Sequence, residues 1–442
     1  MPSEKLALQG GTPVRTKPWQ LNLTLGKEET DAAVRALQQG LISMFEGSAQ
    51  PDPPFSFWGG PRVRELEEAW ASFYKTRFGV SMNSATSGLI AAIGALGIGY
   101  GDEVIVSPYT MSAAATAPLV YGAIPVFADV TDAGSLDPAS VAARITPRTK
   151  GIIVVHQFGI PAEMDRILEL AARHNLKVVE DCAQAHGALY KGRPVGTLGD
   201  IGVFSLNVNK TIQSGEGAVC LTGDEQLRHR LALIRNHAEA VVEGAGVQEL
   251  TNLLGFNFRM TEVTAAIALE QLKKLERLNT ERLELVETLS RALAGHPFLV
   301  PPPACAHAAS GERCASGCRS TYYMVPVRFL EEKAGLERAE FIRMLEAEGT
   351  PFSAGYVKPL YRLPLFQKKS LFKQGYPFEA PANRESKPDY RAGSCPNTEK
   401  LYYKEMLINE YVRPPHTRDD ISDIAAAVKK VTAALKKELS PA

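Results

Sequence analysis

The sequence has little that would place it outside the ordinary globular proteins. Six cysteines in 442 residues are too few for a disulfide framework, and a reducing compartment would keep them as thiols. No run approaches the roughly 18 apolar residues of a membrane span, and residues 1–9 have no signal-peptide core. Lysine plus arginine equals aspartate plus glutamate at 49 each, so no net field favours nucleic acid or an anionic membrane. We expect a cytoplasmic protein that acts on small molecules and has no nucleic-acid or membrane partner.

Cys305, Cys314 and Cys318 form the densest group of cysteines, within the run CAHAASGERCASGC. A zinc site would need a fourth ligand, for which His307 is the nearest candidate, and the paired short spacings of zinc-binding motifs. The surrounding small residues are typical of a loop. We therefore expect ordinary thiols here and no metal site.

Short apolar runs alternate with helical segments between residues 78 and 222, which indicates parallel strands buried on both faces. The chain is long for one hydrophobic core, so two domains are expected. A predicted helix from Thr261 to about Leu293 leads into strand-like residues 320–329 and amphipathic helices over 337–349 and 419–439. We predict an α/β large domain over residues 1–284 and a small α+β domain over residues 285–442.

Three polar segments follow predicted strands, at the edge where ligands bind in open α/β sheets. Residues 83–88 (NSATSG) lead into a helix, whose first amides and dipole favour a phosphate, although Ser or Thr there is often a plain N-cap. Asp181 ends an apolar strand and either meets a cation, such as a protonated pyridine nitrogen, or caps the next helix. Lys210 precedes a Gly-rich turn, where a partly desolvated amine could form a Schiff base, although most loop lysines are surface charges.

Taken together, three segments resemble the DegT/DnrJ/EryC1/StrS family of sugar aminotransferases, which use pyridoxal 5′-phosphate (PLP). The segments are SATSGL, EDCAQAHG and SLNVNKTIQSGEG, and VHQFGIPAEMD and GFNFRMTE are further matches. The resemblance is close over about residues 8–272 and weak beyond. It implies the transferase architecture of fold type I, with a mostly parallel central sheet sandwiched by helices and a small C-terminal domain. It also implies PLP as cofactor and a homodimer with shared active sites.

The resemblance also implies a role for individual residues. Lys210 would carry PLP and move the catalytic proton, and Asp181 would keep the pyridine nitrogen protonated. Gln184 would lie beside the ring near its phenolic oxygen, and Asn257 would reach a phosphate across the dimer interface. The implied cofactor-binding set is Ala85, Thr86, Ser87, Met111, Asp181, Gln184, Ser205, Lys210 and Asn257.

Two residues depart from the family pattern. Met111 stands where many members have an aromatic ring stacked on PLP, and a thioether can pack on such a face. Ala85 stands where glycine is common, which a negative φ would tolerate. Lys210 argues against the family branch that has histidine at this position and dehydrates keto sugars.

The function implied by the resemblance is amination of a keto-sugar or keto-cyclitol, with glutamine or glutamate as donor, by a ping-pong mechanism. The alternatives are other PLP chemistry, namely dehydration, cyclisation or aminohydroxybenzoate formation, and a non-catalytic PLP-binding regulatory subunit. The candidate residues for contacting the acceptor are His156, Gln157, His186, Asn207 and Tyr356.

Three further segments have open roles. Residues 46–61, rich in Gly and Pro, form either a lid over the substrate or an ordered surface loop. Residues 305–318 and 376–395 look like insertions relative to shorter family members and are candidates for shaping substrate choice.

Overall fold

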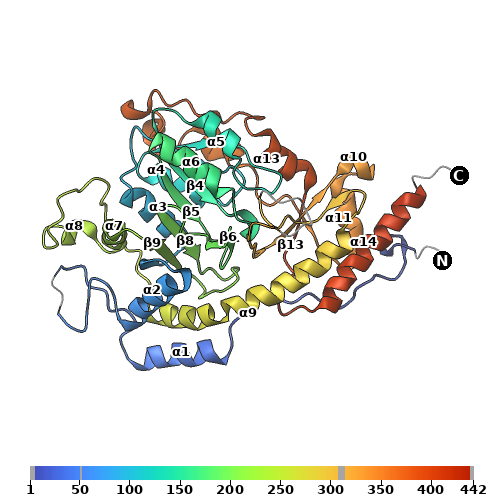
Figure 1. The fold of residues 1–442 in the computed structure, drawn as a ribbon, viewed down its shortest axis with the longest axis horizontal. Coiled ribbons are helices and arrows are strands. Elements are labelled where there is room, and N and C mark those ends of the chain that lie inside the picture. The colour runs from blue at the N-terminus through green and yellow to red at the C-terminus, as the bar shows by residue number, and fades with distance from the viewer. Residues whose placement is uncertain (1–4, 50–51, 307–313, 439–442) are drawn as a thin grey trace.

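A seven-stranded sheet forms the centre of the chain, as Figure 1 shows. The computed structural model describes residues 5–49, 52–306 and 314–438. The strand order is β1-β9-β8-β5-β4-β2-β3, and all neighbours are parallel except the pairs that β9 makes with β8 and β1. The predicted α/β architecture with a mostly parallel sheet is therefore confirmed. The strands are β1 (Phe78–Met82), β2 (Glu103–Val106), β3 (Ile124–Phe127), β4 (Thr149–Val155), β5 (Lys177–Asp181), β8 (Ile201–Ser205) and β9 (Ala218–Thr222).

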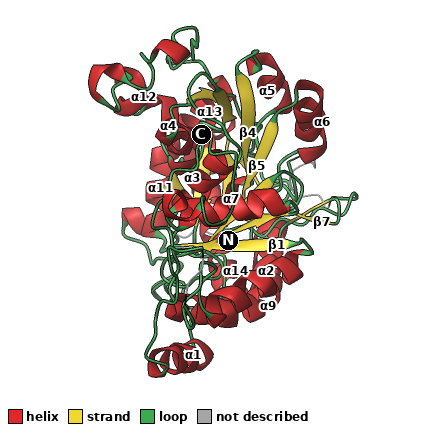
Figure 2. Cartoon of the chain, turned by 90° about the vertical axis from the view of Figure 1, so that its left-hand side faces the viewer, coloured by secondary structure: helices red, strands yellow, loops and turns green. Residues whose placement is uncertain are grey.

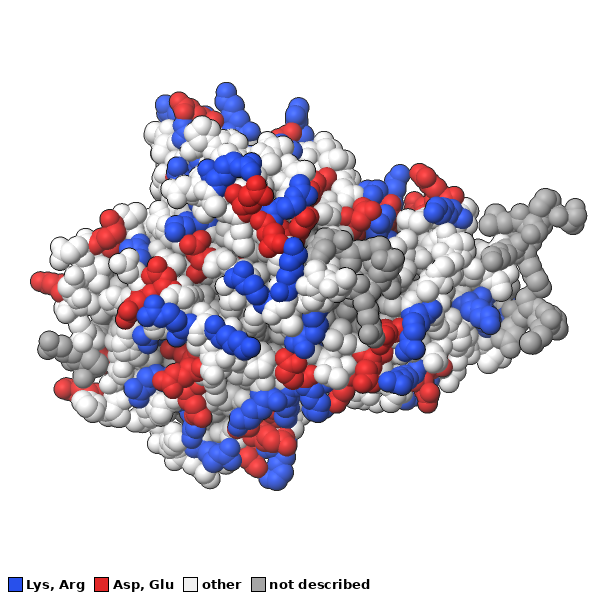
Figure 3. All heavy atoms as spheres, viewed as in Figure 1, with Lys and Arg blue, Asp and Glu red and all other residues white. Residues whose placement is uncertain are grey.

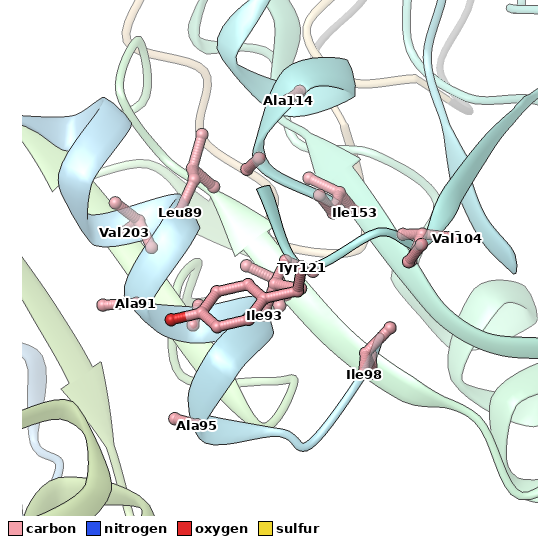
Figure 4. Packing of buried hydrophobic residues seen from close by; sticks show 14 of the residues in the cluster. Leu89, Ala91, Ile93, Ala95, Ile98, Val104, Ala114, Tyr121, Ile153 and Val203 are labelled. Atoms are coloured by element: carbon pink, nitrogen blue, oxygen red, sulfur yellow. The ribbon is translucent and has the colours of Figure 1, made fainter. Parts of the chain in front are cut away.

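Helices cover both faces of this sheet (Figure 2). One face packs against α3 (Ala85–Ala95), α4 (Ala113–Val120) and α7 (Glu225–Arg235). The other packs against α2 (Pro61–Tyr74), α5 (Pro138–Arg144), α6 (Met164–His174) and the first part of α9 (Glu262–Leu293), and α1 (Lys27–Gln38) lies outside α9. Figure 4 shows Leu89 and Ile93 of α3 among side chains of the strands, including Val203 and Ile153. Burial on both faces explains why these strands are almost uniformly apolar.

Short side chains fix the starts of the helices that matter for the site. The Ser84 hydroxyl accepts the Ser87 amide at 3.1 Å before α3, and the Thr261 hydroxyl accepts the Thr264 amide at 3.2 Å before α9. Such caps satisfy amides that have no partner inside the helix. Helix α9 begins immediately after the predicted Thr261 and ends at the predicted Leu293.

A second, antiparallel sheet follows in the order β10-β11-β13-β12. Its strands are β10 (Leu299–Val300), β11 (Val325–Phe329), β12 (Ser353–Ala354) and β13 (Met406–Asn409), and it packs with α11 (Arg338–Ala347) and α14 (Arg418–Glu438). Helix α9 runs from the large sheet to this one and meets α14 there (Figure 1). The division of the chain at residue 285 stays a prediction, because α9 continues through that position.

The segment from 376 to 395 lies along the β3 edge of the large sheet. Asn383 accepts the Gly101 amide and donates to the Gly122 carbonyl, and the Tyr390 hydroxyl donates to the Pro125 carbonyl at 2.6 Å. These contacts concern the starts of β2 and β3, whereas the predicted site residues follow the ends of strands. The expected influence of this segment on substrate choice has no support in this placement.

The described part of residues 46–61 is anchored to the large domain. Phe57 is buried, Trp58 packs against His229 of α7, and the Asn236 side chain donates to the carbonyls of Glu46 and Phe57. Residues 50 and 51 lie outside the described ranges. The contacts favour the ordered surface loop over the lid.

The surface carries charges of both signs. On the face drawn in Figure 3, acidic and basic side chains alternate without a large area of one sign. Within residues 5–49, 52–306 and 314–438, no helix has the length and apolar character needed to cross a membrane.

Candidate active site

The three predicted segments meet at one edge of the large sheet. Strands β5 and β8 are parallel, and β1 runs in the same direction as β8 because both are antiparallel to β9. The ends of β1, β5 and β8 therefore lie on the same side, and each leads into one of the segments. This is the edge at which ligands sit in open α/β sheets.

Lys210 lies in the loop after β8 with its amine turned towards Tyr323. Its Nζ is 4.4 Å from the centre of the Tyr323 ring, and it makes no hydrogen bond or ion pair with any described residue. Burial lowers the pKa of Lys210, and the charge of Asp181 opposes that shift. A half-buried amine with a lowered pKa is a nucleophile suited to attack a carbonyl carbon.

Asp181 ends β5 and faces the same space. Its Oδ1 accepts the Ala183 amide at 3.0 Å, and within the described residues no cation is hydrogen-bonded to this buried carboxylate. Burial raises the pKa of Asp181, while the Ala183 amide and the charge of Lys210 lower it. The carboxylate is thus suited to a cationic group that comes from outside the chain.

The adjacent acid, Glu180, is fully engaged within the protein. Its two oxygens accept the amides of Gly196, Leu198 and Gly199, and His156 Nε2 lies 3.0 Å from Oε2. Burial raises the pKa of Glu180, but the hydrogen bond and charge of His156 and the amides lower it overall.

His156 belongs to the framework of the site. Its Nδ1 accepts the Ala162 amide at 3.1 Å, so Nε2 carries the proton and donates it to Glu180. The ring is fully buried and both nitrogens are used, so His156 has no polar atom left for the acceptor. We no longer propose it as a substrate contact.

Gln184 bridges two parts of the site. Its Oε1 accepts the Phe158 amide at 2.7 Å, and its Nε2 donates to the Tyr356 hydroxyl at 3.0 Å. Burial raises the pKa of Tyr356, and the hydrogen bond from Gln184 opposes that shift. Gln157 is fully buried, and its side-chain oxygen and nitrogen have no hydrogen-bond partner among the described residues. The structure therefore joins two of the predicted residues, Gln184 and Tyr356, by a direct hydrogen bond.

The turn before α3 offers hydrogen-bond donors to an anion. Ser84 acts as the N-cap, whereas the amides of Ala85 and Thr86 at the helix start make no hydrogen bond with any described residue. The Ser87 hydroxyl donates to Asn83 Oδ1 at 2.6 Å and is used internally. Ser205, at the end of β8, is buried and accepts the Asn207 amide at 3.3 Å. Free amides at a helix N-terminus are a ready site for phosphate.

Four predicted residues lie differently from the rest. His186 is buried with its ring edge-on to Trp70 and Phe204, and burial lowers its pKa to about 3, so it is a neutral core residue. Asn207 is held within its own loop by Glu216 at 3.0 Å. Asn257 and Met111 are exposed, and the Asn257 carbonyl accepts the side chain of Asn83 at 3.3 Å.

The sequence did not identify three residues at the site. Tyr323 lies beside Lys210, and the charges of Arg282 and Arg413 both lower the pKa of Tyr323, against the burial that raises it to about 12. The Nε atoms of both arginines are buried without a hydrogen-bond partner among the described residues. No local motif marks these positions, because Arg282 lies on α9 and Tyr323 and Arg413 follow α9 in the chain.

The half-buried amine of Lys210, the buried acid of Asp181 and the open amides before α3 fit the carbonyl, the ring nitrogen and the phosphate of PLP. With the α/β fold, they define a PLP-dependent transferase. The chain matches the DegT/DnrJ/EryC1/StrS aminotransferase family over residues 55–429 and belongs to it. It is therefore a PLP-dependent aminotransferase.

Several known proteins are similar to this chain over nearly its whole length. The L-glutamine:2-deoxy-scyllo-inosose aminotransferase of Streptomyces paromomycinus is 33% identical, covering 97% of this chain and 98% of its own. The X-ray structure of an aminotransferase from Psychrobacter cryohalolentis is 30% identical with a TM-score of 0.78, covering 96% of this chain and all of its own. The crystal structure of 3-amino-5-hydroxybenzoic acid synthase is 26% identical with a TM-score of 0.72, covering 96% and 100%.

Proposed function

We propose that this chain moves an amino group from glutamine or glutamate to a ketone of a sugar or cyclitol, in two half-reactions at one site. The observation that carries the proposal is the electrostatic pairing of the half-buried Lys210 amine with the buried Asp181 carboxylate. Neither group is hydrogen-bonded to a partner of opposite charge among the described residues. The similarity to the inosose aminotransferase, over 97% of this chain and 98% of that protein, supports a cyclitol acceptor.

Each residue of the site has a distinct task in this proposal. PLP, when bound, supplies an electron sink for the carbanion formed at the donor's Cα. Lys210 would hold the cofactor and move the proton that leaves Cα, and Asp181 would keep the ring nitrogen protonated. The amides of Ala85 and Thr86, with Ser205, would bind the phosphate. Gln184 is held in one orientation by the Phe158 amide and Tyr356, so it can present a fixed amide edge to the ring.

The arginines near Tyr323 are suited to the amino donor. Glutamine and glutamate each carry an α-carboxylate, which a guanidinium group binds through charge-assisted hydrogen bonds. Arg413 has a buried Nε with no partner among the described residues, and its charge lowers the pKa of Tyr323, whose ring lies beside the Lys210 amine. We assign Arg413 to the donor's carboxylate.

We propose that the site is completed in a homodimer. Asn22 of the N-terminal arm donates to the Lys210 carbonyl at 2.9 Å, while its neighbours Leu21 and Leu23 are 72% and 74% exposed. Met111 and Val208, on the loops after β2 and β8, are about half exposed. Apolar side chains gathered around a site favour a protein partner over water. Sedimentation of the purified chain as a monomer at micromolar concentration would contradict the dimer.

The decisive experiment follows the absorbance of the purified protein with PLP before and after glutamine or glutamate is added. Transamination predicts loss of the visible band of the bound cofactor, and its return when a keto-inositol such as 2-deoxy-scyllo-inosose is added. Lys210→Ala should abolish turnover, whereas Lys177→Ala, at the start of β5, should leave it unchanged. Near wild-type turnover in Lys210→Ala would refute the proposal.

A second candidate is formation of an aminohydroxybenzoate or related PLP chemistry, which the likeness to the 3-amino-5-hydroxybenzoic acid synthase favours. In that case neither donor would change the spectrum, and a cyclic keto acid would react without an added amino acid. The same spectra therefore separate the two functions.

A further inference from the structure

The three sulfur atoms of Cys305, Cys314 and Cys318 lie within 4.8 Å of one another. Cys305 is fully buried, and the other two are partly exposed. All three belong to the connection between β10 and β11, in the second half of the chain. In a tetrahedral zinc site with Zn–S bonds of about 2.3 Å, two sulfur ligands are separated by about 3.8 Å. The cluster is therefore already close to the size of a three-thiolate metal site.

Hydrogen-bond donors surround these sulfur atoms. The Lys191 amide donates to Cys318 Sγ at 3.2 Å, and the Ser316 hydroxyl lies 2.9 Å from Cys314 Sγ and 3.9 Å from Cys318 Sγ. Donors directed at sulfur stabilise thiolates, which are the form that binds metal.

Sulfur atoms this close together form a donor set that suits a thiophilic cation such as zinc.

We propose that Cys305, Cys314 and Cys318 bind one zinc ion as three of its four ligands. No other Cys, His, Asp or Glu among the described residues falls within the same 4.8 Å group. His307, the candidate fourth ligand from the sequence, lies outside the described residues and is no part of the proposal. A surface pocket lined by Leu283, Ala304, Cys314, Cys318 and Tyr322 gives an ion access to the cluster.

The zinc site has a structural role, because the segment after Cys318 carries Tyr323, whose ring lies beside the Lys210 amine. Arg319 exchanges backbone hydrogen bonds with Leu189 and donates to the Gly187 carbonyl. Further on, the Tyr323 amide donates to the Phe158 carbonyl at 2.9 Å, and the Tyr323 ring lies under the Lys210 amine. A zinc ion at Cys318 would fix one end of the segment that positions this ring.

The spacings of the three cysteines do not pair, and taken alone they favour ordinary thiols. The fold favours a metal site instead, since it brings Cys305 against the turn that holds Cys314 and Cys318. The competing outcome is a disulfide between two of the three, which would leave the third as a thiol and bind no zinc.

The test measures zinc in the full-length protein, purified after growth with added zinc and without chelators, by elemental mass spectrometry. We expect about one zinc ion per chain in the wild type, and loss of it in Cys314→Ser and in Cys318→Ser, both partly exposed positions that a serine can occupy. Cys395→Ala, which removes a buried thiol outside the cluster, is the control and should keep its zinc.

Two further measurements keep the proposal falsifiable if a variant folds poorly. Ser316→Ala retains all three ligands and should weaken zinc binding by about 10- to 100-fold in a chelator competition, as expected for a residue that supports a ligand. Cobalt(II) substituted into the wild type should give thiolate charge-transfer absorption. A wild type without zinc, retention of zinc by both serine variants, or an unreduced mass lower by two hydrogens would each overturn the proposal.

Discussion

Neutralising Asp181 should change two properties of the site in opposite directions. In Asp181→Asn the side chain keeps its shape and can still accept the Ala183 amide, but it no longer offers a charge to the cofactor's ring nitrogen. Breaking one side of a buried charged pair costs about 3–5 kcal/mol. At about 1.36 kcal/mol for each factor of ten, turnover should fall by roughly two to nearly four orders of magnitude.

Capture of the cofactor by Lys210 should respond differently. The charge of Asp181 raises the pKa of Lys210 against the larger effect of burial, so removing that charge lowers the pKa further. Because only the neutral amine reacts with the PLP carbonyl, the pH at which capture becomes fast should move down in the variant. Wild-type capture should itself be half-maximal below the ordinary lysine value of 10.5.

The assay mixes apoprotein with PLP across a pH series and follows the visible band of the bound cofactor, while steady-state turnover is measured on the same preparations. General damage to the fold would slow capture at every pH and would not move the profile down. Loss of the buried charged pair requires at least a hundredfold fall in turnover, so turnover within about fivefold of wild type would refute the reasoning. A capture profile shifted to higher pH would refute it as well.

Three other changes test separate parts of the site. Glu180→Gln should lower the free energy of unfolding by about 3–5 kcal/mol at pH 7, because a buried carboxylate that holds three amides is lost. The fold lowers the pKa of Glu180, so the stability that its carboxylate contributes is present above the usual pKa of 4.5 and is lost as the pH falls through the lower folded value. The urea midpoints of variant and wild type should therefore converge below pH 4.5. A gap that stays constant with pH would contradict this. Tyr356→Phe leaves the Gln184 side-chain amide without its hydrogen-bond acceptor, at a cost of about 1–3 kcal/mol. PLP binding should weaken about tenfold in equilibrium dialysis. An unchanged Kd would count against a role for Gln184. Arg413→Met should raise the donor's KM by about 10- to 100-fold, the worth of a hydrogen bond to a charged group, with the PLP spectrum unchanged, and an unaffected KM would remove Arg413 from the donor site.

The sheet and the long helix could be predicted because their signals are local. Uniformly apolar runs are required of strands buried on both faces, and Thr261 followed by helical spacing defines the start of α9. Helix α4 is short, covering Ala113–Val120 with Pro118 in its last turn. Proline lacks the amide needed to continue the hydrogen-bond ladder.

The site was only partly predictable, because only some of its residues lie in local motifs. Lys210, Asp181 and Gln184 lie in compact motifs directly after strands, so the topology alone brings them to one edge. Tyr323 comes from the second half of the chain, and no local pattern reveals that its ring lies beside Lys210. The same holds for Arg413, whose charge acts on Tyr323. Histidine is a common catalytic residue, which made His156 a candidate. Its two ring nitrogens are instead hydrogen-bonded to Glu180 and Ala162, and the spacing of residues in the sequence does not reveal these contacts.

The way the β3 edge is covered has a consequence for association between copies of this chain. An uncovered outer strand offers a row of amides and carbonyls to which a strand of another molecule can add. Here Pro125 removes one amide, the Tyr390 hydroxyl occupies the Pro125 carbonyl, and the ring packs on Phe127. The segment that carries Tyr390 thus protects the protein from edge-to-edge aggregation, and shortening it would threaten solubility before it altered chemistry.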